Sequence, residues 1–457
     1  MEVGQQLERL VRRGQREHRV PAVQAAVRRA DRPLWTCQVG TAGPGTALDA
    51  DTRFRIGSVT KTFTAVLVLQ CRDEGLLDLD DTLGAHLDVP KHGEVTLRRL
   101  LSHTSGLQRE PYGDLWDTLA TIDEQQAIAE LARAERVLPP ARRFHYSNLG
   151  YALLGQLVAA RRGARWEDVL TDRVLKPLGL SATTLGPGDR AATGYLVDAY
   201  SDHARPEPLT DLGAIGPAAQ LWSTAGEMAR WAAFLADPAG VDPDGTVLAS
   251  GTVQEMAFPL TVRDEQLWSS GFGLGLIVVP REDRVRDIGH GGAMPGFLAG
   301  VYGRTGPGVP KATGAAVLLS SGVAAGALTL PHQLLDLALA EDPPEIAPWT
   351  PGEPAPEELR GVLGRWWGEG YEWIFSWRDG RLEARSADAA NDVPTSVFAP
   401  EGPDLLRVAS GREAGELLRL TRDQAGQVVR MHWATYRFTR GQETFDGVTA
   451  SLPVDQG

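Results

Sequence analysis

Hydrophobic positions near the start of the chain change from the spacing of strands to the spacing of helices. Alternating apolar residues predict a hairpin over 22–43. Apolar residues three and four apart then predict a helix over 58–73. Mainly helical patterns follow, including an amphipathic segment over 121–136 that ends at a pair of prolines. We therefore expect a helical insertion over about 75–265.

Strand patterns return after the helical stretch. They cover 272–279, 286–293, 296–302 and 315–319. Strands at both ends with helices between them predict an α/β sandwich whose sheet is assembled from distant parts of the chain. We expect this domain to span 1–340.

The last quarter of the chain has a different pattern. Residues 341–358 are rich in proline and glutamate and are predicted to form an extended linker. From 359 to 457 we expect an all-β domain, because short alternating segments follow one another and an Asp-Gly turn joins the strands around 372–384. A small barrel or half-barrel is the economical arrangement, since closure removes exposed edges.

Composition narrows the classes of function. The net charge of −13 and the pI near 5.3 argue against a general role in binding nucleic acid or membrane surfaces. The two cysteines and nine scattered histidines have no metal-ligand spacing, so we expect no metal and no cofactor. Residues 1–20 form an amphipathic pattern without the apolar core of a signal peptide, which predicts a cytoplasmic protein.

The first candidate for chemistry is Ser58, with Lys61 three residues later on the same helical face. Ser58 falls at the first turn of the predicted helix, where free N–H groups stabilise a developing anion. The neighbours of Lys61 are mostly apolar, so its pKa should fall and its amine should accept the serine proton. A serine cap beside a lysine that extends to solvent is the alternative at this point.

The second candidate is Tyr146 with Asn148, at the start of a predicted helix. The phenol can relay a proton to a leaving group, and the amide can bridge the lysine and a substrate. A helix cap with a packed tyrosine is the structural alternative.

The third candidate is the stretch from His290 to Ala293. Gly291 and Gly292 allow a substrate backbone to approach a strand edge. The N–H groups of Ser58 and Ala293 are predicted to form an oxyanion hole, and His290 to hold a substrate carbonyl or orient the tyrosine. A glycine-rich turn with a surface histidine is the alternative.

These three motifs, in this order, make the chain resemble the serine β-lactamase and penicillin-binding-protein superfamily, in its class C, esterase-like branch. The stretches 54–61, 102–107, 222–225 and 289–297 fit as well, and the resemblance covers roughly 11–340. It implies a β-lactamase-like antiparallel sheet with helices, an all-helical subdomain and a lipocalin-like C-terminal domain. It also implies substrate contacts from Trp222. His290 stands where β-lactamases and transpeptidases commonly carry lysine, which favours esterase or thioesterase chemistry.

The resemblance is closest to penicillin-binding-protein-type thioesterases, stand-alone enzymes that release and cyclise nonribosomal peptides. It implies that Ser58 accepts a peptidyl group ending in a D-residue from a thioester, on a peptidyl carrier protein, and that the peptide's own amine releases it. A cytosolic hydrolase of small esters or β-lactams is the alternative, and a non-catalytic acyl-binding protein is a third. Arg437 is predicted to meet a substrate carboxyl or carbonyl, with a solvated surface arginine as the alternative.

Overall fold

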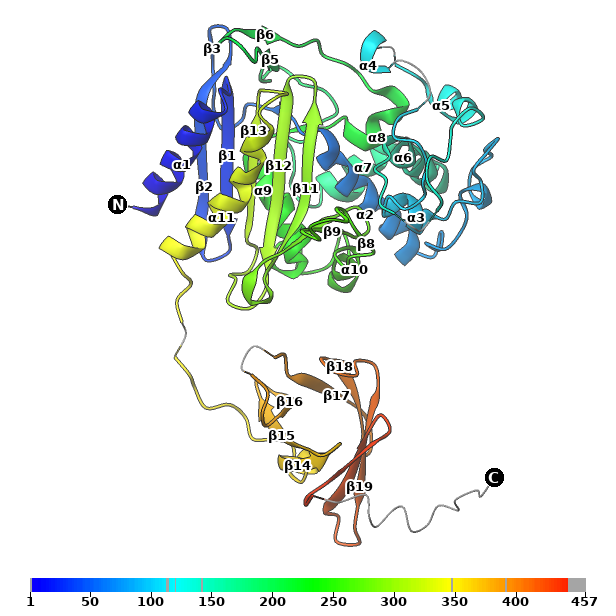
Figure 1. Ribbon diagram of the computed structural model, residues 1–457, viewed down its shortest axis with the longest axis vertical. Helices are drawn as coiled ribbons and strands as arrows, with labels where there is room; N and C mark the ends of the chain where they lie inside the picture. The colour runs from blue at the N-terminus through cyan, green and yellow to red at the C-terminus, as the bar shows by residue number, and fades with distance from the viewer. Residues whose placement is uncertain are drawn as a thin grey trace. The chain divides into compact units, whose positions relative to one another are not determined.

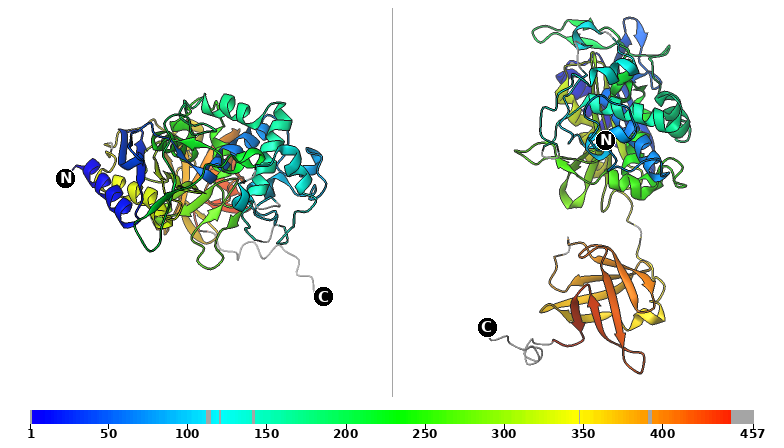
Figure 2. Two further views of the ribbon diagram at one scale, coloured as in Figure 1. Left: turned by 90° about the horizontal axis from the view of Figure 1, so that it is seen from above. Right: turned by 90° about the vertical axis from the view of Figure 1, so that its right-hand side faces the viewer.

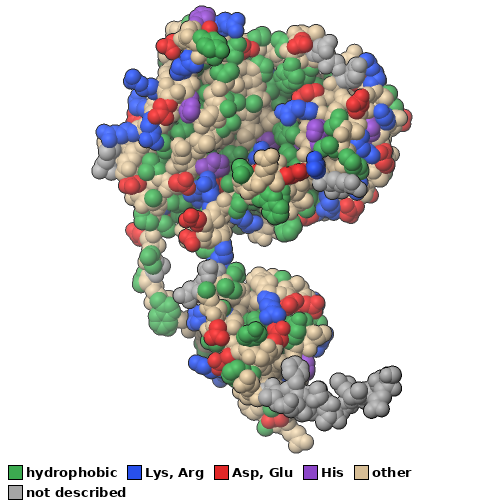
Figure 3. Space-filling view, viewed as in Figure 1, with side chains coloured by type: hydrophobic (Ala, Val, Ile, Leu, Met, Phe, Trp, Pro, Cys, Tyr) green, Lys and Arg blue, Asp and Glu red, His purple; other side chains and the backbone are tan. Residues whose placement is uncertain are grey.

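The chain folds into two compact units, Met1–Glu345 and Ile346–Gly457 (Figure 1). The computed structural model describes residues 2–111, 115–119, 121–140, 143–346, 348–390 and 393–442. Charged side chains of both signs are intermixed over the face drawn in Figure 3.

A nine-stranded sheet, antiparallel between all neighbours, forms the centre of the first unit. The hairpin predicted over 22–43 lies beside strands from 260 to 320, as the split pattern of the sequence predicts. In sheet order the strands are β3 (Thr46–Ala47), β2 (Arg32–Gly43), β1 (Ala22–Arg29), β13 (Gly314–Leu319), β12 (Phe297–Thr305), β11 (Arg286–Met294), β10 (Ile277–Pro280), β9 (Gly271–Phe272) and β8 (Thr261–Val262).

Both faces of this sheet are covered by helices. α1 (Val3–Glu17) and α11 (Leu330–Glu341) lie on one face, and α9 (Ala225–Ala236) packs on the other (Figures 1 and 2). Alternate residues of β1 serve the two layers: Val23 packs with α1 and α11, whereas Ala22 packs in the core that contains α9. The expected helical insertion extended to about 265, but α9 within that range belongs to the sheet layer.

A buried ion network joins the sheet to α11. The Asp287 carboxylate on β11 is fully buried and accepts hydrogen bonds from Arg304 on β12 at 2.6 Å and Arg281 at 2.8 Å. It also lies 2.7 Å from Nδ1 of His332 on α11. Burial alone would raise the pKa of Asp287, but these partners hold it far below its ordinary value. The network ties neighbouring strands and a covering helix together.

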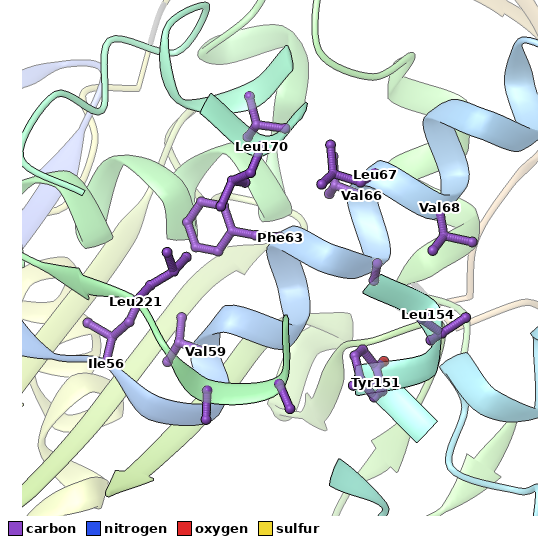
Figure 4. Close-up of a cluster of buried hydrophobic side chains, with 14 of the residues drawn as sticks. Ile56, Val59, Phe63, Val66, Leu67, Val68, Tyr151, Leu154, Leu170 and Leu221 are labelled. Carbon is purple, nitrogen blue, oxygen red and sulfur yellow. The ribbon is translucent and has the colours of Figure 1, made fainter. Parts of the chain in front are cut away.

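The helical part of the first unit surrounds α2, which is buried continuously from Thr60 to Cys71. In Figure 4, Phe63 and Leu67 of α2 lie beside Leu170, and Val68 lies near Leu154. Each such side chain contributes roughly 2 kcal/mol of transfer free energy. The helices are α2 (Thr60–Asp73), α3 (Leu97–Leu101), α4 (Leu115–Thr118), α5 (Glu124–Glu130), α6 (Asn148–Arg162), α7 (Trp166–Leu170), α8 (Gly216–Ala219) and α10 (Ser250–Met256).

Two short pairs of strands lie outside the nine-stranded sheet. β4 (Phe54–Arg55) pairs with β7 (Trp222–Ser223), and β5 (Tyr195–Val197) pairs with β6 (Ala204–Pro206). The first pair places the residues before Ser58 against the segment that follows α8.

Two predicted elements differ from the structure. The strand over 272–279 is two strands, because Gly275 has a φ of +83° and a Cβ on Gly273 would lie 2.1 Å from a backbone carbonyl oxygen. The helix over 121–136 is reduced to α5, which begins after the capping box of Asp123 and ends at Glu130. Tertiary pairing overrides the helical pattern at its end, since Arg136 bridges to Leu107.

The second unit is a closed, antiparallel eight-stranded barrel, which confirms the predicted lipocalin-like domain. Its interior combines aliphatic side chains with aromatic ones, which include Trp366, Phe375, Trp433 and Phe438. A short helix, α12 (Glu357–Arg360), precedes it. The strands are β14 (Gly364–Gly368), β15 (Tyr371–Arg378), β16 (Arg381–Ser386), β17 (Ser396–Gly402), β18 (Leu405–Ser410), β19 (Leu417–Arg422), β20 (Val428–Trp433) and β21 (Tyr436–Thr439).

Among the described residues, no helix combines the length and apolar character needed to cross a membrane. No cluster of three or more His, Cys, Asp or Glu side chains in the same residues could hold a metal ion.

Candidate active site

Ser58 lies on a 3-10 turn, η1 (Gly57–Val59), that leads directly into α2. This turn touches β11 through backbone atoms. Gly57 has a φ of +50°, and a Cβ on it would come within 2.8 Å of the Ala293 nitrogen. A Cβ on Gly292 would lie 1.9 Å from the Ile56 carbonyl oxygen. The two glycines thus allow the candidate nucleophile to sit against the edge where the oxyanion hole is predicted.

Lys61 is fully buried and is therefore not a lysine that extends to solvent. Its Nζ lies 3.1 Å from Ser58 Oγ. It also donates to Asn148 Oδ1 at 2.6 Å and to the Ala218 carbonyl at 2.8 Å. The amine therefore connects α2, α6 and α8 at the candidate nucleophile.

The surroundings of Lys61 favour the neutral amine. Burial lowers its pKa well below the ordinary value; Glu110 opposes this shift and Arg109 adds to it. A neutral amine has two N–H groups and one lone pair. Because Asn148 Oδ1 and the Ala218 carbonyl can only accept, they take the two N–H groups. The lone pair is then left for the Ser58 hydroxyl, as a general base requires.

Asn148 is held in one orientation by a carboxylate that the sequence analysis did not identify. Its Nδ2 donates to Glu110 Oε1 at 2.6 Å, so its Oδ1 faces Lys61. Asn148 does not cap α6, because the Ser147 hydroxyl accepts the Gly150 N–H instead. The amide is thus free to link Lys61 to Glu110.

Tyr146 lies over the amine, with Lys61 Nζ 4.7 Å from its ring centroid. The ring of His103 packs against it at 4.3 Å. Burial raises the pKa of Tyr146, an effect that the neighbouring Ser58 hydroxyl partly opposes. The phenol therefore keeps its proton at neutral pH. Its hydroxyl is buried without a hydrogen bond of ordinary geometry to the described residues, which leaves it available to a reacting group.

His290 on β11 is 3% exposed and therefore not a surface histidine. Its Nδ1 bonds to the Gly291 carbonyl, which can only accept, so Nδ1 carries the hydrogen and Nε2 is an acceptor. Burial is the main cause that lowers the pKa of His290, to about 3. The His290 side chain is therefore a neutral imidazole, and its Nε2 has no hydrogen-bond partner among the described residues.

The other predicted substrate contacts lie at different places. Gly291 is half-buried, and a Cβ on it would have its nearest contact at 3.8 Å, whereas Gly292 lies in close contact with the nucleophile turn. Trp222 is buried, packs edge-on against Phe297, and lines a separate cavity. Arg437 lies exposed on β21 of the second unit, and its contact with substrate stays a prediction.

Two site residues escaped sequence reasoning. Glu110 follows no motif, and its place beside Asn148 arises only from folding. His103 falls within the stretch 102–107 that carries the resemblance, but the pattern gave it no role. Its Nδ1 accepts the Ser147 N–H at 3.1 Å, which anchors the loop that carries Tyr146. Its backbone is left-handed, with a φ of +56°, and its polar neighbours Ser102 and Thr104 gave no sign of this in the sequence.

Comparison with known protein families finds matches over both units. The family described as Beta-lactamase matches residues 7–337. A domain of unknown function, DUF7586, matches residues 355–440. The chain is 33% identical to penicillin-binding protein 4 of Amycolatopsis lactamdurans, over 78% of this chain and 95% of that protein.

Solved structures extend the likeness. SurE is 25% identical with a TM-score of 0.59, over 96% of this chain and 99% of SurE, and a structure of SurE with D-Leu gives the same values. A D-stereospecific amidohydrolase from Streptomyces sp. is also 25% identical, with a TM-score of 0.57, over 74% of this chain and 97% of that chain. The match to SurE covers both units, whereas the second match covers about three quarters of the chain.

Proposed function

The chain belongs to the beta-lactamase family of serine hydrolases, and we propose that it is a penicillin-binding-protein-type thioesterase that cyclises a peptide head to tail. The observation that carries the catalytic part is the buried Lys61 amine 3.1 Å from Ser58 Oγ, with both N–H groups of the neutral amine taken by fixed acceptors.

The first half of the proposed reaction forms an acyl-enzyme. Lys61 Nζ takes the proton of Ser58 Oγ as this oxygen bonds to the thioester carbonyl carbon. The N–H groups of Ser58 and Ala293 stabilise the resulting oxyanion. When the C–S bond breaks, the Tyr146 phenol gives its proton to the leaving sulfur, and Lys61 returns a proton to the phenolate. The acyl group then remains on Ser58.

The second half releases the peptide. The amine at the peptide's own N-terminus attacks the Ser58 ester, and Tyr146 with Lys61 accepts the proton that the amine loses. Collapse of the second oxyanion returns a proton to Ser58 Oγ and leaves an amide bond. Holding both ends of one chain in the site gives the amine a high effective concentration compared with a separate acceptor.

The neutral state of His290 favours a substrate that has no free carboxylate next to this side chain. A cation there would pair with the carboxylate of a cell-wall peptide or a β-lactam, whereas a buried neutral imidazole leaves such a charge unpaired. Its acceptor Nε2 suits an N–H donor, such as a peptide amide. A peptidyl thioester meets both conditions, because it has no free carboxylate at the reacting carbonyl and its backbone amides supply N–H donors.

The similarity to SurE supports a peptide ending in a D-residue, since a structure of that protein is with D-Leu. The similarity to a D-stereospecific amidohydrolase points the same way. The proposal implies a peptidyl carrier protein as donor, nonribosomal peptide biosynthesis as the setting, antibiotic biosynthesis as its purpose, and the cytoplasm as the place of reaction.

The test uses two linear peptidyl thioesters that differ only in a C-terminal D- or L-leucine. We expect an acyl adduct on Ser58 by intact mass and a product one water lighter than the linear acid, formed faster from the D-ending thioester. Ser58→Ala is the control for both signals. Hydrolysed acid alone, or no turnover, would contradict the cyclase proposal.

A hydrolase of small esters or amides is the second candidate, and the likeness to the Streptomyces amidohydrolase favours it. Water would then be the second nucleophile at the same acyl-Ser58. Rapid turnover of a short chromogenic ester or a D-amino acid amide, with no gain from a peptidyl thioester, would select this alternative.

A further inference from the structure

His103 is a fully buried histidine that lies beside Tyr146, in the turn that follows α3. The centroids of the two rings are 4.3 Å apart, and the ring planes are tilted by 32°. No step of the proposed reaction uses the imidazole as an acid or a base. Its place next to the proton donor therefore calls for another explanation.

Two hydrogen bonds join His103 to the residues on either side of Tyr146. The His103 carbonyl accepts the His145 N–H at 2.8 Å, and Nδ1 of the same residue accepts the Ser147 N–H at 3.1 Å. Because the two donors flank Tyr146 in the chain, these bonds fix its backbone from both sides. The Ser147 N–H is buried, so the loss of its acceptor would be costly.

The imidazole of His103 is held in its neutral form. Burial is the main cause that lowers its pKa well below the ordinary value. Since a backbone N–H can only donate, Nδ1 is the acceptor and Nε2 carries the hydrogen. The rings of Phe144, Tyr151 and Phe272 surround the imidazole with centroids 5.6, 5.1 and 4.9 Å away. The ring is thus fixed among aromatic side chains and remains an acceptor at neutral pH.

The phenol of Tyr146 depends on such packing for its orientation. Its hydroxyl has no hydrogen bond of ordinary geometry to the described residues, so no partner fixes that end of the side chain. The rings of Phe144 and His290 also lie near the phenol, but their centroids are 6.4 and 6.0 Å away. His103, at 4.3 Å, makes the closest of these ring contacts. The same residue thus holds both the backbone and the ring of Tyr146.

We propose that His103 is a positioning residue that holds the Tyr146 phenol where its proton reaches the leaving group. The proposal rests on the role of Tyr146 in acylation given above, and it applies whether an amine or water then releases the acyl group. A leaving group that departs readily as an anion needs little help from a proton donor, whereas a basic one needs more. Displacement of the phenol should therefore slow acylation most for basic leaving groups.

The experiment measures thiol release in a single turnover as Ser58 is acylated by two thioesters of one peptide that ends in D-leucine. One thioester carries thiophenol, which leaves readily as an anion, and the other carries the more basic N-acetylcysteamine. His103→Ala removes both the ring and the Nδ1 acceptor, and should slow the N-acetylcysteamine thioester at least tenfold more than the thiophenyl one. His103→Asn keeps a side-chain acceptor and suits the left-handed backbone, so it should recover part of this loss.

Two comparisons separate positioning from a general effect on folding. Tyr146→Phe should show the same dependence on the leaving group, and adding His103→Ala to it should have little further effect, because no phenol proton remains to be positioned. His92→Asn is the matched control. His92 is also buried, with a φ of +63°, but its ring bonds to the Ala134 carbonyl. This variant should leave the ratio of the two rates unchanged.

Equal slowing of both thioesters in His103→Ala, or unchanged rates, would overturn the proposal. So would a full loss from His103→Ala in the Tyr146→Phe protein, since the histidine would then act independently of the phenol. If His103→Ala does not fold, the ratio of rates in His103→Asn decides. If neither thioester acylates wild-type Ser58, the thioesterase proposal fails, and the matching aryl and alkyl oxygen esters carry the same test of His103.

Discussion

Removing the charge of Glu110 should move the pH dependence of Ser58 acylation. The carboxylate bonds to Asn148 Nδ2, and the opposite end of that amide accepts from Lys61. In Glu110→Gln the side-chain oxygen still accepts from Asn148, so the geometry is retained while the charge is lost. Because Glu110 raises the pKa of Lys61 against the effect of burial, its neutralisation should lower that pKa further.

The size of the effect follows from the hydrogen-bonded chain. Two bonds of 2.6 Å in series, together with the width of the amide, separate the two charges by about 7 Å. At an effective dielectric constant of about 20 this corresponds to about 2 kcal/mol. Partial exposure of Glu110 and the charge of Arg109, 3.5 Å away, reduce it. We expect the pKa of Lys61 to fall by about one unit.

The assay is the rate at which a fluorophosphonate labels Ser58, measured by intact mass between about pH 5 and 10. The neutral amine is the reactive form, so the acid limb of the profile reports the pKa of Lys61. In Glu110→Gln this limb should move to lower pH by about one unit. Asp80→Asn, which removes an exposed carboxylate paired with Arg98, should leave it in place. A limb that stays put or moves to higher pH in Glu110→Gln would refute this electrostatic role.

Further predictions concern the base, the nucleophile turn, the ion network and the barrel. Lys61→Met should slow fluorophosphonate labelling by roughly 10²–10⁴-fold without unfolding the protein, as labelling kinetics and circular dichroism would show. Gly292→Ala should lower the melting temperature and the labelling rate, because its Cβ would lie 1.9 Å from a backbone carbonyl oxygen, whereas Gly291→Ala, with its nearest contact at 3.8 Å, should be tolerated. Asp287→Asn should cost about 3–5 kcal/mol in urea unfolding at neutral pH. Since the pKa of Asp287 is lowered on folding, its contribution is present at neutral pH and should fade as the pH drops through the folded pKa. Arg437→Ala should raise KM for the peptidyl thioester, and unchanged kinetics would dismiss that contact.

The periodicity of hydrophobic residues predicted which segments form strands of the sheet, but not where those strands break. The β1–β2 hairpin and the later strands were readable because one side chain in two faces each helical layer. The break at Gly275 was not readable, since it depends on a close approach between segments distant in sequence. The short α5 has the same kind of cause. An isolated β-bridge between Arg136 and Leu107 ends a sequence pattern that would suit a longer helix.

The sequence by itself determined the chemistry available: a serine and a lysine three apart at a helix start, a tyrosine with an asparagine, and a histidine before paired glycines. These choices are local, because spacing along one helix or strand decides which side chains share a face. Only the tertiary structure decided their state. The loss of water around Lys61, the acceptors on two separate segments that direct its lone pair, and the tautomer of His290 all depend on contacts across the fold. Glu110 likewise acquires its role only when remote segments meet, because desolvation and hydrogen bonding act through space.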